Sequence, residues 1–248
     1  MASKSETGHA KNIANLETLI GFCTGYGPTY NPSKAAIKIP ALTTLHTNAV
    51  GTLASINNVL PLYNNAINAR DAAFSPLSKL ITRVVNAAQA SDISPKGIGD
   101  LKTIARKLQG KRATPKNDDP PKEAATPEEE SSKNISASQM SFDQRIENMD
   151  KLIQLLAAQP AYIPNETELT IASLTTVLTT MRSTNTAAIA AFTPVSNARI
   201  NRNNLLYKDD TGLVDLAADV KKYVKSVFGA TSPQYKQVSG LKFTKVKS

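Results

Sequence analysis

Apolar side chains recur every three or four residues along most of this chain, the spacing that places them on one face of an α-helix. The longest run extends from Ile39 to Ile67 and includes Pro61. Because the period continues on both sides of this proline, we expect one kinked helix and not two separate helices. Three shorter runs in the first half of the chain predict further helices, over residues 13–23, 77–88 and 98–108.

The second half of the chain repeats this pattern. In each long run a proline, two asparagines and an isoleucine occupy the same relative places. The first set is Pro61, Asn64, Ile67 and Asn68, and the second is Pro194, Asn197, Ile200 and Asn201. The flanks also correspond. Tyr30 and Pro32 match Tyr162 and Pro164, and the helix over 13–23 matches residues 146–156. Leu77, Leu80 and Val84 match Leu213, Leu216 and Val220. We therefore predict a tandem duplication, and we call paired residues of this kind matched positions.

Composition sets the boundaries between the repeated parts. Residues 113–141 are rich in proline, serine and acidic side chains and contain one branched aliphatic residue, which is typical of a disordered linker. The last segment alternates polar and apolar residues, so it is either a basic tail or an edge segment packed on the bundle. The predicted organisation is a first helical bundle over 10–112, an acidic, proline-rich linker over 113–141, a second bundle over 142–240 and a basic tail over 241–248.

Each half contains one medium helix, one long kinked helix, a second medium helix and a short terminal element. Four such elements form a small up-down bundle, so we predict an all-α protein of two tandem homologous bundles. The linker permits either two tethered bundles or two bundles packed face to face about a pseudo-twofold axis. The thin core of each half favours face-to-face packing.

The positive charge of the chain indicates an anionic partner. The formal net charge is +9, and residues 1–112 carry 13 basic and 5 acidic side chains. A basic cluster closes this half: Lys102, Arg106, Lys107, Lys111 and Arg112. Such a cluster is suited to phosphate, to a nucleic-acid backbone or to the acidic linker. The alternative is favourable positive charge at a helix C-terminus together with solubility.

The paired asparagines leave two interpretations open. Asn64 and Asn68 lie one helical turn apart, as do Asn197 and Asn201. They form either a polar pocket that contacts a ligand, or a structural polar network or solvated face. Because the pair is present in both halves, the structural interpretation is favoured over a unique active site.

Residues that carry catalysis or bind metals are few. Cys23 is the single cysteine, and neither His9 nor His46 has a ligating partner at suitable spacing. We therefore predict no catalytic, metal or cofactor site. The N-terminus lacks the apolar segment of a secretory signal, and no apolar run is long enough to cross a bilayer. A cytoplasmic location without a membrane span is expected.

Three phrases of the sequence carry a resemblance. They are Cys-Thr-Gly-Tyr-Gly-Pro-Thr-Tyr-Asn-Pro-Ser-Lys (23–34), Tyr-Asn-Asn-Ala-Ile-Asn-Ala-Arg (63–70) and Ser-Pro-Gln-Tyr-Lys-Gln-Val-Ser-Gly-Leu-Lys-Phe (232–243). The chain resembles a family of uncharacterised, internally duplicated helical proteins common in Bacteroidota, over most of its length outside the linker. The resemblance implies a bacterial source and a helical, duplicated fold, and it implies no activity, cofactor or site.

These observations favour a non-enzymatic interaction or structural protein, which acts on an unknown protein partner or by self-association. The alternative is a protein that binds nucleic acid or an anionic surface through its basic first half. A third hypothesis is an enzyme whose site lies in a cleft between the two bundles.

Overall fold

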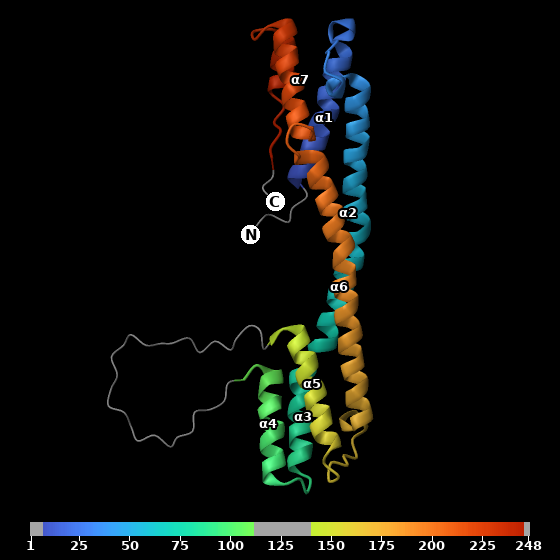
Figure 1. Cartoon of the computed structure of the whole chain (residues 1–248), viewed down its shortest axis with the longest axis vertical. Coiled ribbons are helices and arrows are strands. Elements are labelled where there is room, and N and C mark those ends of the chain that lie inside the picture. The colour runs from blue at the N-terminus through green and yellow to red at the C-terminus, as the bar shows by residue number, and fades with distance from the viewer. Residues whose placement is uncertain (1–6, 112–139, 246–248) are drawn as a thin grey trace, which may run out of the picture. The chain divides into compact units, whose positions relative to one another are not determined.

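Two long helices dominate the computed structural model, which describes residues 7–111 and 140–245 (Figure 1). They are α2 (Ile39–Phe74) and α6 (Ile171–Tyr207), of 36 and 37 residues. Each continues through its internal proline, Pro61 or Pro194, because the apolar period on both sides keeps the helix packed. Every regular element in the described ranges is helical, which confirms the predicted all-α class.

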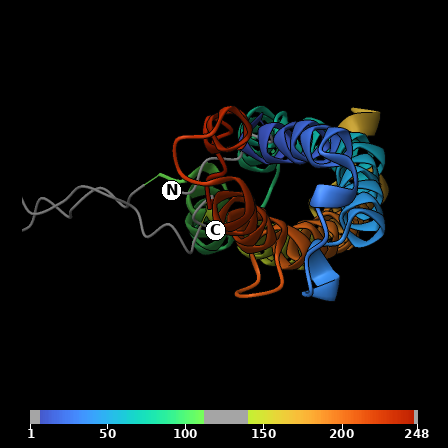
Figure 2. The ribbon, with the colours of Figure 1, turned by 90° about the horizontal axis from the view of Figure 1, so that it is seen from above.

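The chain folds as two compact units, and α2 and α6 contribute residues to both. The terminal unit comprises residues 1–63 and 191–248. Its own elements are α1 (Thr7–Gly25), η1 (Gly27–Thr29), η2 (Ala35–Ile37), α7 (Leu213–Phe228) and α8 (Pro233–Ser239). Seen from above in Figure 2, blue segments from the N-terminal part lie beside red segments from the C-terminal part. The hydroxyl of Tyr26 at the end of α1 accordingly donates to the backbone oxygen of Gln234 in α8, at 3.0 Å.

The core of the terminal unit is aliphatic. Leu16, Leu19 and Leu42 are fully buried in it, and Leu213 and Val220 reach it from α7. Burying each such side chain contributes about 1.5–3 kcal/mol relative to exposing it. Packing along α1 and α7, which lie far apart in the sequence, therefore holds this unit together.

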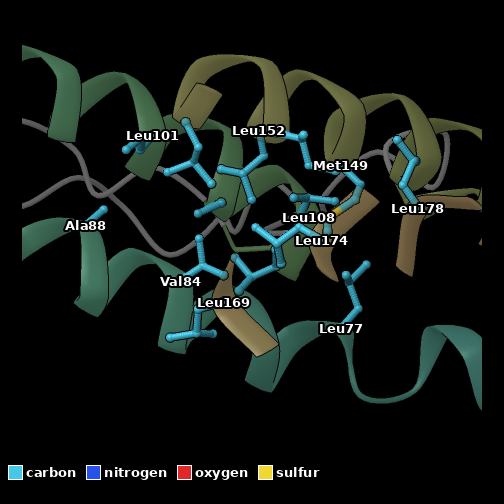
Figure 3. Packing of buried hydrophobic residues seen from close by; sticks show 14 of the residues in the cluster. Leu77, Val84, Ala88, Leu101, Leu108, Met149, Leu152, Leu169, Leu174 and Leu178 are labelled. Carbon is cyan, nitrogen blue, oxygen red and sulfur yellow. The ribbon is translucent and has the colours of Figure 1, made fainter. Parts of the chain in front are cut away.

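The central unit comprises residues 64–190. Its own elements are α3 (Leu77–Gln89), α4 (Pro95–Gln109), α5 (Phe142–Ala157) and η4 (Thr167–Leu169). Figure 1 shows α3, α4 and α5 side by side. In the close view of Figure 3, side chains of α3, α4, α5 and α6 lie between the ribbons of these helices, among them Val84, Leu101, Leu152 and Leu174. These side chains form one core, to which every helix of the unit contributes.

The compact units do not coincide with the predicted bundles over 10–112 and 142–240. The terminal unit packs α1, from the first half of the chain, against α7 and α8 from the second half. The central unit packs α3 and α4, from the first half, against α5. The physical reason is that matched helices carry the same apolar positions. The hydrophobic pattern therefore fits either pairing of the helices and does not select one.

The segment after α8 packs on the terminal unit. The side chain of Asn12 donates to the backbone oxygen of Thr244 at 2.8 Å and accepts from its backbone N–H at 3.0 Å. Asn15 donates to the backbone oxygen of Lys242 at 2.7 Å. Of the predicted basic tail, residues 241–245 thus match the packed-segment alternative, and 246–248 lie outside the described residues.

The predicted linker over 113–141 lies outside the described residues except at its end. There Ser141 accepts a hydrogen bond from the backbone N–H of Gln144 at 3.2 Å and so caps α5. The side chain of Met140 lies against Gly110, which follows α4: a β-carbon at this glycine would stand 2.7 Å from the Met140 sulfur. The described residues on the two sides of the linker are therefore in contact.

Candidate functional site

A groove between α3 and α4 collects three of the five residues in the predicted basic cluster. Lys102 and Arg106 lie one turn apart on α4 and so share a face, and Lys111 follows the helix. The groove has a volume of about 260 Å³. The side chains that line it are Thr82, Val85, Asn86, Lys102, Ala105, Arg106, Gln109 and Lys111. We call this surface the basic groove.

Local sequence signals position α4 along the groove. The Ser94 hydroxyl accepts from the backbone N–H of Gly97 at 3.2 Å, and Pro95 occupies the first turn, so the helix begins here. It ends at Gly110, whose φ of 67° is a left-handed conformation that glycine adopts without strain. This turn, and not a continued helical face, brings Lys111 to the groove.

Hydrogen bonds fix the two walls of the basic groove. The side-chain amide of Gln109 donates to the Thr82 hydroxyl at 2.8 Å and to the backbone oxygen of Ser78 at 3.1 Å, which ties the end of α4 to α3. The Arg106 guanidinium donates to the Thr103 hydroxyl at 3.2 Å. None of the three cations forms an ion pair with any residue that the structure describes.

The other predicted site residues do not join this groove. Lys107 is exposed on α4 but does not line it, and Arg112 lies outside the described residues. All four paired asparagines are exposed on the long helices, which matches the solvated-face alternative: Asn64, Asn68, Asn197 and Asn201.

A larger open pocket, of about 560 Å³, adjoins the basic groove, and Asn86 lines both. It lies between the C-terminal part of α3 and the turn before α6. Its lining residues are Arg83, Asn86, Ala87, Ala90, Ser91, Tyr162, Ile163, Pro164, Asn165, Glu166 and Leu169. We call it the α3 pocket. Sequence reasoning missed it, although Tyr162 and Pro164 were recognised as matched positions.

Two interactions shape the α3 pocket. The Arg83 guanidinium pairs with the Glu168 carboxylate at 2.5 Å and so holds the turn against α3. The buried Tyr162 donates its hydroxyl proton to the backbone oxygen of Leu169 at 2.9 Å. Burial, together with the negative charge of Glu166, raises the pKa of Tyr162 to about 12. This tyrosine therefore stays protonated at neutral pH and acts as a wall of the pocket, not as a base.

Polar side chains of the terminal unit are engaged in internal contacts. His9 and Asn12 are buried, and the His9 Nδ1 atom lies 2.6 Å from the Tyr207 hydroxyl. The Cys23 thiol is 1% exposed, and burial raises its pKa to about 12, so a nucleophilic thiolate is strongly disfavoured. These groups stabilise the unit.

A third hollow lies between α4 and α5 and has a volume of about 530 Å³. Ile104 and Leu155 form part of its lining, and its two carboxylates are already paired. Glu147 pairs with Lys151 at 2.5 Å, and Asp150 pairs with Arg182 at 2.6 Å. No group of three or more metal-ligating side chains occurs among the described residues.

Comparison with protein-family models, with curated proteins and with solved structures finds no match for this chain. Within residues 7–111 and 140–245, no helix combines the length and the apolar character that crossing a membrane requires. The functional proposals below therefore rest on the geometry of the basic groove and the α3 pocket.

Proposed function

We propose that this chain is a non-enzymatic interaction protein, built from a duplicated helical bundle, whose basic groove binds the phosphate backbone of nucleic acid. The observation that carries this proposal is the convergence of Lys102, Arg106 and Lys111 on one groove. Clustered lysine and arginine side chains on one face are the electrostatic signature of a phosphate-binding surface. Residues 75–111 contain seven basic and two acidic side chains, which extends the positive field around the groove.

Two parallel contacts support the duplication within this proposal. The Tyr30 hydroxyl donates to the backbone oxygen of Ile37 at 2.6 Å, and the matched Tyr162 hydroxyl donates to that of Leu169 at 2.9 Å. Both bonds close a turn of the same length in front of a long helix. A common ancestor of the two halves explains why the same buried tyrosine closes both turns.

The lining of the groove favours one mode of binding. Among the described residues that line it none is aromatic, so they offer no surface on which bases stack. Lysine and arginine then bind phosphates without reading the sequence. With three cations on a single strand, log K should fall with log salt concentration with a slope of about −2.

Fluorescence anisotropy with a labelled oligonucleotide of about 12 nucleotides tests this proposal at low and moderate salt. The variant Lys102→Gln/Arg106→Gln/Lys111→Gln should lose most of its affinity and most of the salt dependence. The matched control is Lys11→Gln/Lys38→Gln/Lys208→Gln, which removes the same charge from exposed positions of the terminal unit. Absence of binding at about 50 mM salt, or an equal loss in both variants, contradicts the proposal.

A further inference from the structure

The terminal unit contains a filled counterpart of the α3 pocket. There the ring of Tyr223, on α7, packs edge-on against Tyr30, with ring centroids 5.3 Å apart and an interplanar angle of 88°. Its hydroxyl accepts a hydrogen bond from the backbone N–H of Asn31 at 3.2 Å. The matched proline, Pro32, is buried beside these residues. An aromatic ring thus closes the space between helix and turn.

The central unit keeps the walls of this arrangement and lacks the ring. The matched leucines and valines of α3 and α7 place Ala87 at the position of Tyr223. Tyr162 is buried like Tyr30 and has the same hydroxyl bond, but it faces small side chains, Ala87, Ala90 and Ser91. Pro164 is only half-buried. The α3 pocket therefore corresponds to the place of a missing aromatic ring.

The exposed walls of the α3 pocket are suited to binding an aromatic ring from a ligand. Ile163 is 80% exposed at its edge, so a ring that enters would cover apolar surface that now contacts water. Tyr162 offers the edge-to-face contact that Tyr30 gives to Tyr223. Asn165 and Glu166 add an amide and a carboxylate at the rim, which can accept hydrogen bonds from the N–H groups of a heterocycle.

The α3 pocket lies beside the basic groove, and this position indicates which kind of aromatic ring would enter it. Asn86 lines both hollows, so a ligand that fills them carries phosphates on one side and a planar ring on the other. Bases in a duplex are stacked and paired, whereas those of a single strand can be turned out into a pocket. We propose that the α3 pocket receives an unstacked base of a single-stranded nucleic acid whose backbone lies in the basic groove. This inference rests on the proposed function.

Paired ligands separate the two proposals. One is a single-stranded oligonucleotide of about 12 nucleotides, and the other is an abasic oligomer with the same number of phosphates. Wild-type protein should bind the base-bearing oligomer about tenfold more tightly than the abasic one. If neither oligomer binds, the proposed function fails. If both bind equally, the basic groove stands and the base pocket is refuted.

The variant Ala87→Tyr rebuilds the arrangement of the terminal unit and fills the α3 pocket from within. It should remove the preference for base-bearing ligand and leave the affinity for the abasic oligomer unchanged. The matched control is Gln89→Tyr, an exposed residue of α3 that lines neither hollow, and it should keep the preference. A preference that survives in Ala87→Tyr overturns the inference.

Nuclear magnetic resonance of the wild-type protein gives a second measurement, which decides the matter if Ala87→Tyr does not fold. The ring protons of Tyr162 and the methyl group of Ala87 should shift when the base-bearing oligomer is added, and they should not shift with the abasic one. A tyrosine-containing peptide is added in a separate titration as a competing kind of ring. Equal shifts with both oligomers, or shifts with the peptide alone, overturn the assignment of the pocket to a base.

Discussion

The terminal and central units share a local arrangement of helix and turn and differ in how they fill the space beside it. In both, a buried tyrosine closes the turn before a long helix, and that turn packs on a medium helix. The terminal unit fills the remaining space with Tyr223, whereas the central unit leaves an open pocket beside Ala87. The difference in side-chain size between Tyr223 and Ala87, at matched positions of the sequence, is what the proposed base pocket rests on.

Two groups of cations, one in each unit, also differ. In the terminal unit, Lys221 donates to the backbone oxygen of Leu241, and Lys245 pairs with Asp209 and Asp215 at 2.9 and 3.1 Å. These charges hold the last segment of the chain in place. In the basic groove of the central unit, the cations have no carboxylate partner among the described residues. The three cations of the basic groove therefore differ from Lys221 and Lys245, and also from the ion-paired cations of their own unit, Arg83, Lys151 and Arg182.

The proposed correspondence between the two units can be tested through the largest expected effect. Leu19 of α1 and Leu152 of α5 occupy matched positions, and both have 0% exposure. Replacing either with alanine removes buried methyl groups and leaves a cavity, so each variant should lose about 2–5 kcal/mol of unfolding free energy. Urea denaturation measures both losses. The exposed control Lys11→Ala should change stability by less than about 0.5 kcal/mol. A loss below about 1 kcal/mol in one variant, beside a loss within the expected range in the other, would contradict the correspondence of the two units.

The sequence predicted the helices because the apolar period depends on local spacing alone. The pairing of helices was beyond that signal, since matched leucines fit either partner. Charge is a second signal that bears on the pairing. Lys34 pairs with Asp219 at 2.7 Å in the terminal unit, and Arg83 pairs with Glu168 in the central unit. Arg83 and Asp219 are matched positions, so bundles formed within each half would bring Lys34 near Arg83 and Glu168 near Asp219. Like charges would then face each other.

The candidate site was predictable in part for a related reason. The spacing of Lys102 and Arg106 is a local property of one helix, and it placed them correctly on one face. Asn86 and Thr82 join them only because α3 packs beside α4, which is a tertiary contact. The α3 pocket was harder still, because the signal is the absence of a large side chain. Only the comparison of Ala87 with Tyr223 makes that absence visible.

Removing the ring of Tyr223 tests whether the α3 pocket is open because Ala87 replaces an aromatic residue. Tyr223→Ala should cost about 1–3 kcal/mol, because a half-buried ring and its contacts with Tyr30 and Asn31 are lost. It should also create a pocket in the terminal unit that resembles the α3 pocket. Adding p-cresol, which carries the ring and hydroxyl of tyrosine, should restore part of the stability in a thermal melt. The exposed control Lys225→Ala should gain nothing from p-cresol, and an equal gain in both would contradict the comparison.

Exchanging charges between the units gives the smallest expected effect and tests how the helices choose partners. The variant Arg83→Asp/Asp219→Arg keeps the net charge and turns both ion pairs into like-charge contacts. The side chains of Arg83 and Glu168 are 52% and 70% exposed, so each lost pair is worth at most about 1 kcal/mol, and the loss should shrink at high salt. Adding Lys34→Glu/Glu168→Lys rebuilds both pairs with reversed sign, although residue 219 then lies beside Lys222, with which Asp219 pairs at 3.1 Å. Recovery of most of the lost stability in this quadruple variant would support a role of these charges in the pairing, whereas a packing role for the original side chains would leave the loss in place.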